Sequence, residues 1–214
     1  MDQEVDFLKK YGVTVFLDVG ANVGQTGISL RKEGYEGRII SFEPIRHCYD
    51  QMEAAAASDP LWDTRHSAVG AEDGTASIGV SENFVSSSIL DATEDLIAIY
   101  EPIRYTRQEE VPLTRLDSCL PELVPEEDDA VIHLKIDTQG FERFVIDGAL
   151  DALHRINTIR MEVAVSVVYS GEMIVPEAIQ RMTELGYVLI DAWPAWRHPE
   201  TDEVMHFDLL FRRL

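Results

Sequence analysis

Short apolar runs rich in β-branched residues alternate along the chain with longer stretches in which apolar residues recur at helical spacing. This alternation is typical of βα units, in which parallel strands are joined by helices. The predicted strands cover 14–19, 38–42, 62–66, 131–136, 158–163, 187–192 and 204–211, with a further hairpin strand at 74–80. The predicted helical stretches cover about 3–11, 24–33, 46–57, 141–154 and 176–184.

No helix separates the last two predicted strands, so we expect them to form a hairpin at one edge of the sheet. Such a hairpin is a feature of the class I methyltransferase sheet and not of the dehydrogenase sheet. We therefore predict an α/β protein with a class I methyltransferase Rossmann-like fold. Its mostly parallel seven-stranded sheet ends in a C-terminal antiparallel hairpin and carries helices on both faces. The length predicts a single domain over 1–214.

Two segments depart from this rhythm. The segment 81–110 carries a serine cluster and many charges but only weak periodicity, and long loops of this kind in compact domains are often functional. We expect it to be a lid or an acceptor-binding insertion. The segment 121–130 combines prolines with acidic residues and is predicted to be a solvated connector.

The chain is strongly acidic, with 39 Asp and Glu against 18 Lys and Arg and a formal charge of -21. Such a surface repels phosphate backbones and anionic lipid headgroups, so we predict no nucleic-acid and no membrane partner. The first residues are acidic where a signal peptide needs basic ones, and no apolar run approaches the ~20 residues that span a bilayer. We therefore expect a cytoplasmic protein.

The first chemical motif is FLDVGANVGQTG, 16–27, in which an apolar strand enters a helix through a glycine turn. Gly20 and Gly24 are expected to permit the turn and a close approach of the backbone to a ligand. A carboxylate at Asp18 would repel the pyrophosphate of a dinucleotide, whereas it would attract the amino group of a methionyl moiety. This favours S-adenosylmethionine over NAD. The alternative is that Asp18 only caps the turn.

Two later strand ends support a nucleoside. In ISFEP, 40–44, Glu43 precedes Pro44 and lies about 20 residues past the glycines, where an acid accepts hydrogen bonds from ribose hydroxyls. The same acid would serve NAD, so it supports a ribose without choosing the cofactor. In HSAVG, 66–70, Ser67 and Ala68 are candidates for contacts to adenine. Plain strand ends at the surface are the alternative for both motifs.

The segment HLKIDTQGFERF, 133–144, places Asp137 at the end of a strand, where ligands of open α/β sheets bind. Lys135, on the same face, is expected to be a lysine with a buried stem that pairs with an acid. Glu162 in the next strand is predicted to join Asp137 in a pair that positions the acceptor or acts as base. His206 is the reserve candidate. We predict that the site holds no metal. The alternatives are that the carboxylate pair binds a divalent cation or that it only makes structural hydrogen bonds.

In this order, DVGANVG, FEP, LTRLD, LKIDTQGFE with IDGA, and MEV resemble the FkbM family of methyltransferases over about residues 14–164. The resemblance implies methyl transfer from S-adenosylmethionine, typically to oxygen on sugars, polyketides or related metabolites. This sequence departs from the family pattern at Gln139, where many members carry Glu. The missing charge argues against a base or metal ligand at this position, and Glu142 is an alternative acid. By motif, the resemblance implies that Asp18, Gly20, Asn22 and Gly24 hold the methionyl end, Glu43 the ribose, and Asp137 a place beside the methyl.

We therefore predict an S-adenosylmethionine-dependent methyltransferase that acts on a hydroxyl of a small-molecule acceptor, as a monomer or homodimer. Tyr169 is expected to shape the acceptor pocket. One alternative is a nicotinamide-dependent reductase, although the Tyr-x-x-x-Lys pair of its commonest short-chain form is absent from the sequence. The other is a non-catalytic nucleotide-binding module on the same fold.

Overall fold

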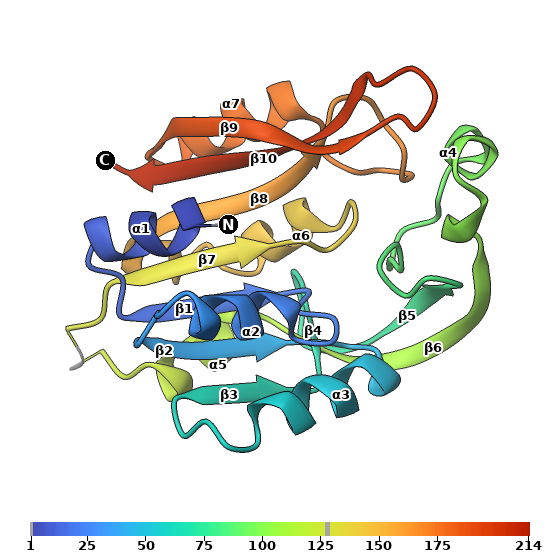
Figure 1. The fold of residues 1–214 in the computed structure, drawn as a ribbon. Coiled ribbons are helices and arrows are strands. Elements are labelled where there is room, and N and C mark those ends of the chain that lie inside the picture. Colours follow the sequence, from blue (N-terminus) through green and yellow to red (C-terminus); the bar gives the residue numbers. More distant parts are fainter. Residues whose placement is uncertain (1, 127–128) are drawn as a thin grey trace.

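The computed structural model describes residues 2–126 and 129–214, with side chains from Glu4 onward. Seven strands form one sheet in the order β3-β2-β1-β7-β8-β10-β9 (Figure 1). All neighbouring pairs are parallel except those that β10 makes with β8 and β9, so the predicted fold is confirmed. The strands are β1 Val15–Val19, β2 Arg38–Phe42, β3 Trp62–Arg65, β7 Ile132–Ile136, β8 Ile156–Ala164, β9 Tyr187–Arg197 and β10 Val204–Arg213.

A second, three-stranded sheet has the order β4-β6-β5, with β4 Ala68–Val69, β5 Gly74–Ser81 and β6 Tyr105–Thr114. Strand β6 was not predicted, because most of its residues are polar and only Val111 and Leu113 are buried. It occupies the end of the irregular segment 81–110, which also contains helix α4 Glu94–Ile99 and a 3-10 turn at Glu101–Ile103. Residues 82–93 are the part of that segment without a helix or a strand.

Helices cover both faces of the large sheet (Figure 1). Apolar side chains of the first three helices pack with Phe16 and Ile39 on one face, and those of the last three pack on the other. The first group is α1 Asp2–Lys10, α2 Gln25–Lys32 and α3 Arg46–Ala56, and the second is α5 Leu116–Leu123, α6 Glu142–Asp147 and α7 Val175–Glu184. No helix in the described part of the chain is long and apolar enough to cross a membrane.

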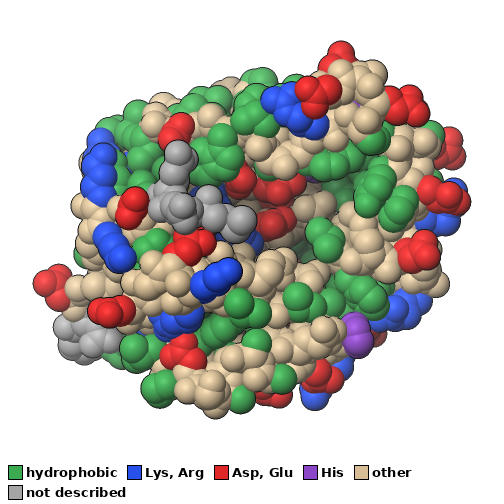
Figure 2. Space-filling view, in the orientation of Figure 1, with side chains coloured by type: hydrophobic (Ala, Val, Ile, Leu, Met, Phe, Trp, Pro, Cys, Tyr) green, Lys and Arg blue, Asp and Glu red, His purple; other side chains and the backbone are tan. Residues whose placement is uncertain are grey.

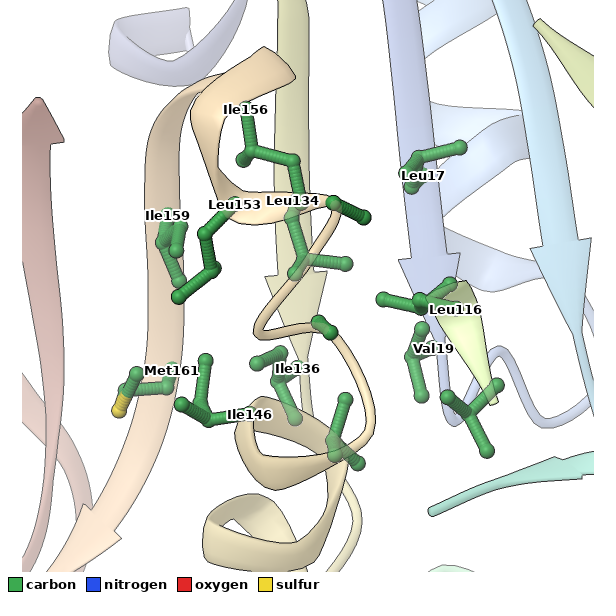
Figure 3. Close-up of a cluster of buried hydrophobic side chains, with 14 of the residues drawn as sticks. Leu17, Val19, Leu116, Leu134, Ile136, Ile146, Leu153, Ile156, Ile159 and Met161 are labelled. Atoms are coloured by element: carbon green, nitrogen blue, oxygen red, sulfur yellow. The ribbon is translucent and has the colours of Figure 1, made fainter. Parts of the chain in front are cut away.

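Alternate residues of the central strands point to opposite faces of the sheet. Leu17, Leu134 and Met161 lie in the apolar cluster that α5 and α6 cover (Figure 3). The residues that follow them in sequence, Asp18, Lys135 and Glu162, therefore point to the face that carries α1. The strand pattern thus collects charged side chains on one face, near the carboxyl ends of β1, β7 and β8.

Candidate functional site

Two clefts meet at the carboxyl ends of the parallel strands, on a hollowed face where acidic side chains gather (Figure 2). The glycine-loop cleft has walls that include Val19, Gly20, Asn22, Glu43, Pro44, Ser67, Ala68, Phe84 and Phe141. The histidine cleft has walls that include Ser86, Tyr100, Glu162, Tyr169, Trp196 and His206. Three residues, Val85, Asp137 and Gln139, line both, so they mark the junction.

The glycines of the first motif serve the chain conformation and packing. Gly20 has φ 80°, and a Cβ there would lie 1.9 Å from the carbonyl oxygen of Asp137. Gly24 has φ 84° and is the N-cap of α2. Gly20 lines the cleft as predicted, and the group that an added Cβ would meet first is the backbone at the end of β7. Gly24 lies outside the cleft walls, against Met52 and Trp62.

Three non-glycine residues with positive φ border the glycine-loop cleft. They are Asn22 at 49°, Phe84 at 61° and Gln139 at 53°. Backbone strain of this kind persists where the surrounding structure fixes it, and it concentrates at ligand sites. The three come from separate loops that meet only in the fold.

Glu43 is almost completely buried at the base of the glycine-loop cleft. Its Oε2 accepts a hydrogen bond from the backbone N–H of Asn22 (2.8 Å), and its Oε1 accepts one from Ile45 (2.7 Å). Burial raises the pKa of Glu43 to about 7, although these two donors work to lower it. Each carboxylate oxygen retains a lone pair, so the group can accept two further hydrogen bonds from a diol.

The far wall of this cleft is small and apolar. Ala68 and Pro44 lie there, next to Ile45 and Phe141. The hydroxyl of Ser67 donates to the carbonyl oxygen of Ala68 (2.7 Å), so the chain itself uses this donor. A flat heterocycle would find apolar contacts here, with backbone groups at its edge.

Asp18 and Asp137 are linked through Lys135. The Lys135 ammonium donates to Asp18 Oδ1 (3.0 Å) and lies 3.5 Å from Asp137 Oδ2. Burial works to lower the pKa of Lys135, but the two carboxylates outweigh it and raise that pKa above its usual value. The predicted pairing of Lys135 with an acid is confirmed. Asp18 is fully buried and lies outside the cleft walls. The ammonium group that contacts it is that of Lys135.

The histidine cleft contains a hydrogen-bonded pair of side chains. The Nδ1 of His206 lies 2.7 Å from Glu162 Oε1. Because an ionised carboxylate only accepts, Nδ1 carries the hydrogen, and the Nε2 of the neutral ring is an acceptor. This Nε2 is buried and has no partner among the described residues. Burial lowers the pKa of His206, but the hydrogen bond and charge of Glu162 outweigh it and raise the pKa overall.

The segment 82–93 and an aromatic group close the histidine cleft. Tyr100 and Trp196 have ring centroids 6.2 Å apart, and Trp196 lies 5.6 Å from the His206 ring. Tyr169 lines the cleft as predicted. The cleft has a volume of about 390 Å³, within the usual size of ligand pockets. The glycine-loop cleft has only about 70 Å³, and Phe84 and Val85 are among its walls.

Glu142, the alternative acid, serves the turn that precedes α6. Its Oε1 accepts hydrogen bonds from the backbone N–H groups of Thr138 (3.0 Å) and Gly140 (3.2 Å). Burial raises its pKa to about 7, although its hydrogen bonds lower it. It lines neither cleft. Among the described residues, no three His, Cys, Asp or Glu side chains are grouped as a metal site.

The structure thus brings most of the predicted residues together. Asp137, Glu162 and His206 share the histidine cleft, while Asp18 and Gly24 line neither cleft. The sequence analysis did not identify Val85, Tyr100 or Trp196 as cleft residues, because they come from segments without a motif. The remaining seven predicted cofactor residues, Gly20, Asn22, Glu43, Pro44, Ser67, Ala68 and Asp137, line the glycine-loop cleft.

Comparison with known proteins agrees with this geometry. Residues 18–189 match the family model described as a methyltransferase FkbM domain. No curated protein matches the sequence. Among solved structures, a putative S-adenosylmethionine-dependent methyltransferase from Listeria monocytogenes is similar, with a TM-score of 0.54 and 9% identity over 99% of this chain and 98% of that one. Aeropyrum pernix fibrillarin in complex with S-adenosyl-L-methionine gives 0.51 and 11% over 92% and 66%.

Proposed function

This chain belongs to the family of FkbM methyltransferase domains, and from that membership we propose that it transfers a methyl group from S-adenosylmethionine to a hydroxyl of a small molecule, with His206 as the base. The family and the fold are those of S-adenosylmethionine-dependent methyltransferases. The observation that carries the proposed chemistry is that His206 lines the cleft beside the glycine-loop cleft and that its buried Nε2 has no partner among the described residues.

The glycine-loop cleft suits the cofactor. The buried carboxylate of Glu43 has lone pairs for the ribose hydroxyls, and the wall around Ala68 suits adenine. Because the cleft is narrow, we propose that Phe84 and Val85 move outward to admit the cofactor and then return over it. When bound, S-adenosylmethionine supplies an electrophilic methyl group on a sulfonium. We propose that Asp137, which lines both clefts, faces that positive charge.

The acceptor hydroxyl is proposed to bind in the histidine cleft and to donate its hydrogen bond to His206 Nε2. Glu162 holds the ring through Nδ1 and stabilises its protonated form. In the transfer, the bond from sulfur to the methyl carbon breaks and the bond from the acceptor oxygen forms, while the hydroxyl proton passes to Nε2. The products are a methyl ether and S-adenosylhomocysteine. No metal is required for this step, because the base and the orientation come from side chains.

The acceptor is proposed to be a small molecule and not a nucleic acid. One similar structure is a putative tRNA (m1A22) methyltransferase from Streptococcus pneumoniae, with 10% identity and a TM-score of 0.50 over 99% of this chain and 72% of that one. The histidine cleft, by contrast, contains Asp137 and Glu162 and no Lys or Arg in its described walls. A formal charge of -21 also opposes the approach of a phosphate backbone.

The first test is calorimetry with S-adenosylmethionine, S-adenosylhomocysteine and NADPH. We expect micromolar binding of the first two and none of NADPH; a preference for NADPH would support the reductase instead. The second test follows S-adenosylhomocysteine formation with a panel of sugars, polyols and phenols, with and without EDTA. We expect turnover that EDTA leaves unchanged and that His206→Ala abolishes. Turnover that depends on a divalent cation would overturn the proposed role of His206.

A further inference from the structure

Gln139 lies at the junction of the two clefts, where the resembling family often has glutamate. Its Nε2 donates to Asp137 Oδ1 (3.1 Å), and its Oε1 accepts a hydrogen bond from the hydroxyl of Tyr169 (3.2 Å). Its backbone carbonyl accepts a further hydrogen bond from the hydroxyl of Ser88 (2.7 Å). The side-chain amide of Gln139 therefore donates through its nitrogen and accepts through its oxygen.

These contacts connect the reaction site to the segment 82–93. The hydroxyl of Tyr169 also lies 3.3 Å from the carbonyl oxygen of Ser86, so its one hydrogen is available to either Ser86 or Gln139. Ser88 pairs with Gly79 of β5 by backbone hydrogen bonds in both directions. The Gln139 side chain thus contacts the carboxylate at the junction, and the Gln139 backbone carbonyl contacts the segment through Ser88.

A glutamate at this position would have the same shape but could not perform the same task. Its ionised carboxylate would have no hydrogen to donate to Asp137, and two anions about 3 Å apart repel each other strongly. One of the two carboxyl groups would then retain a proton to higher pH. The Tyr169 hydroxyl, in contrast, would still find an acceptor. The amide is thus required specifically by Asp137.

We infer that Gln139 is a positioning residue whose side-chain amide holds the Asp137 carboxylate at the junction of the two clefts, while its backbone carbonyl holds the segment 82–93 through Ser88. The orientation of Asp137 then depends on one side chain. The inference rests on the proposed function only in assigning Asp137 a place beside the reacting atoms. The hydrogen-bonding role itself exists in the unliganded protein.

Other charged groups face this position from every neighbouring element. Lys135 is the nearest cation, at 3.5 Å from Asp137. Because these groups are present in each variant, comparison with the wild type at the same pH removes their own titration and leaves the effect of the new carboxyl, including its coupling to them. They are Asp18 on β1, Lys135 on β7, Glu142 on α6, Arg160 and Glu162 on β8, and His206 and Asp208 on β10.

The test compares Gln139→Glu with Gln108→Glu, the same change on the exposed part of β6, where Gln108 accepts a hydrogen bond from Ser77 that glutamate can also accept. The thermal midpoint of the unliganded proteins is measured from pH 5 to pH 8. We expect the deficit of Gln139→Glu relative to the wild type to grow by about 3–6 °C over this range, because the shared proton is lost as pH rises. Gln108→Glu should stay within about 1 °C of the wild type throughout. A deficit that does not change with pH would overturn the inference.

Gln139→Met removes the hydrogen bond to Asp137 without adding a charge and keeps the backbone carbonyl that accepts from Ser88. Its thermal deficit should therefore stay constant within about 1 °C from pH 5 to pH 8, and hydrogen exchange of the backbone amides in 82–93 should match the wild type. A deficit that grows with pH as in Gln139→Glu would show that the pH dependence does not come from two carboxyl groups, and would overturn the inference. In the loaded enzyme, the ratio of kcat for Gln139→Glu to that of the wild type should fall about tenfold between pH 6 and pH 8. If the thermal and exchange results hold but no acceptor is methylated, the proposed function fails and the inference about Gln139 stands.

Discussion

The two clefts differ in how the chain builds them. The glycine-loop cleft is formed largely by loops that directly follow strands, and its polar contacts at Glu43 are backbone N–H groups. The histidine cleft is formed by side chains from β8, β9, β10 and the segment 82–103, which are far apart in the sequence. Its central contact joins Glu162 and His206, two side chains 44 residues apart.

This difference separates two kinds of function. Backbone groups at strand ends depend little on individual side chains, so they suit the binding of a cofactor. Side chains on an antiparallel edge and an inserted segment can change without disturbing the sheet, so they suit recognition of a variable acceptor. Within the cluster Asp18–Lys135–Asp137, Asp137 lines both clefts, and Lys135 links it to the buried Asp18.

Replacement of Lys135 should have the largest effect and damage both clefts. Lys135→Met would leave the fully buried carboxylate of Asp18 without its cation, and loss of one partner of a buried ion pair costs about 3–5 kcal/mol. Urea unfolding measures this loss. Arg46→Met, at an ion pair of which both side chains are more than half exposed, should change stability little. If the double variant Lys135→Met with Asp18→Asn is no more stable than Lys135→Met alone, the stabilising role of the pair is wrong.

Replacement of His206 should affect the histidine cleft alone. His206→Asn should lower kcat about 100- to 1,000-fold, or roughly 2.7–4 kcal/mol, with no change in the affinity for S-adenosylmethionine. Since the base must be neutral, wild-type kcat should rise with pH through a pKa above the usual histidine value. Stopped assays from pH 5.5 to 9 measure this profile, which should be lost in the variant. A variant that keeps the wild-type profile would assign the base to another group.

The contrast between the clefts also explains what the sequence could predict. Gly20 and Glu43 were found because each directly follows a strand that apolar periodicity identifies. The partnership of Glu162 with His206 could not be predicted, since it depends on how β10 is inserted between β8 and β9. The sequence predicted that Lys135 pairs with an acid, but not that this acid is Asp18, because the pairing depends on the register of β1 against β7. Trp196 lines the histidine cleft because β9 extends to Arg197, beyond the predicted end at 192.

The pH dependence of cofactor affinity should distinguish the glycine-loop cleft. Ribose hydroxyls would donate to the ionised form of Glu43, whose pKa burial raises to about 7. The affinity for S-adenosylhomocysteine should therefore weaken about tenfold from pH 8 to pH 6, and binding by the Glu43→Gln variant should be weak and independent of pH.

The stability of the unliganded protein should change in the opposite direction. A raised pKa in the folded state means that the contribution of Glu43 is present at low pH and lost as pH rises through about 7. Calorimetry and urea unfolding at each pH measure the two effects, and a pH dependence that survives in Glu43→Gln would exclude this residue.

The smallest expected effect concerns the aromatic wall of the histidine cleft. Trp196 and Trp193 lie three residues apart on β9, but only Trp196 lines this cleft, next to Tyr100 and His206; Trp193 faces a separate groove beside α1. An aromatic contact contributes about 0.5–1.5 kcal/mol beyond its buried area, so Trp196→Leu should raise the acceptor KM about 3- to 10-fold. The affinity for S-adenosylmethionine should be unchanged, because the residue lies outside the glycine-loop cleft. Trp193→Leu is the matched control and should leave both constants unchanged. Equal effects of the two substitutions would mean that Trp196 acts through the stability of β9, and the acceptor would then have to be placed elsewhere.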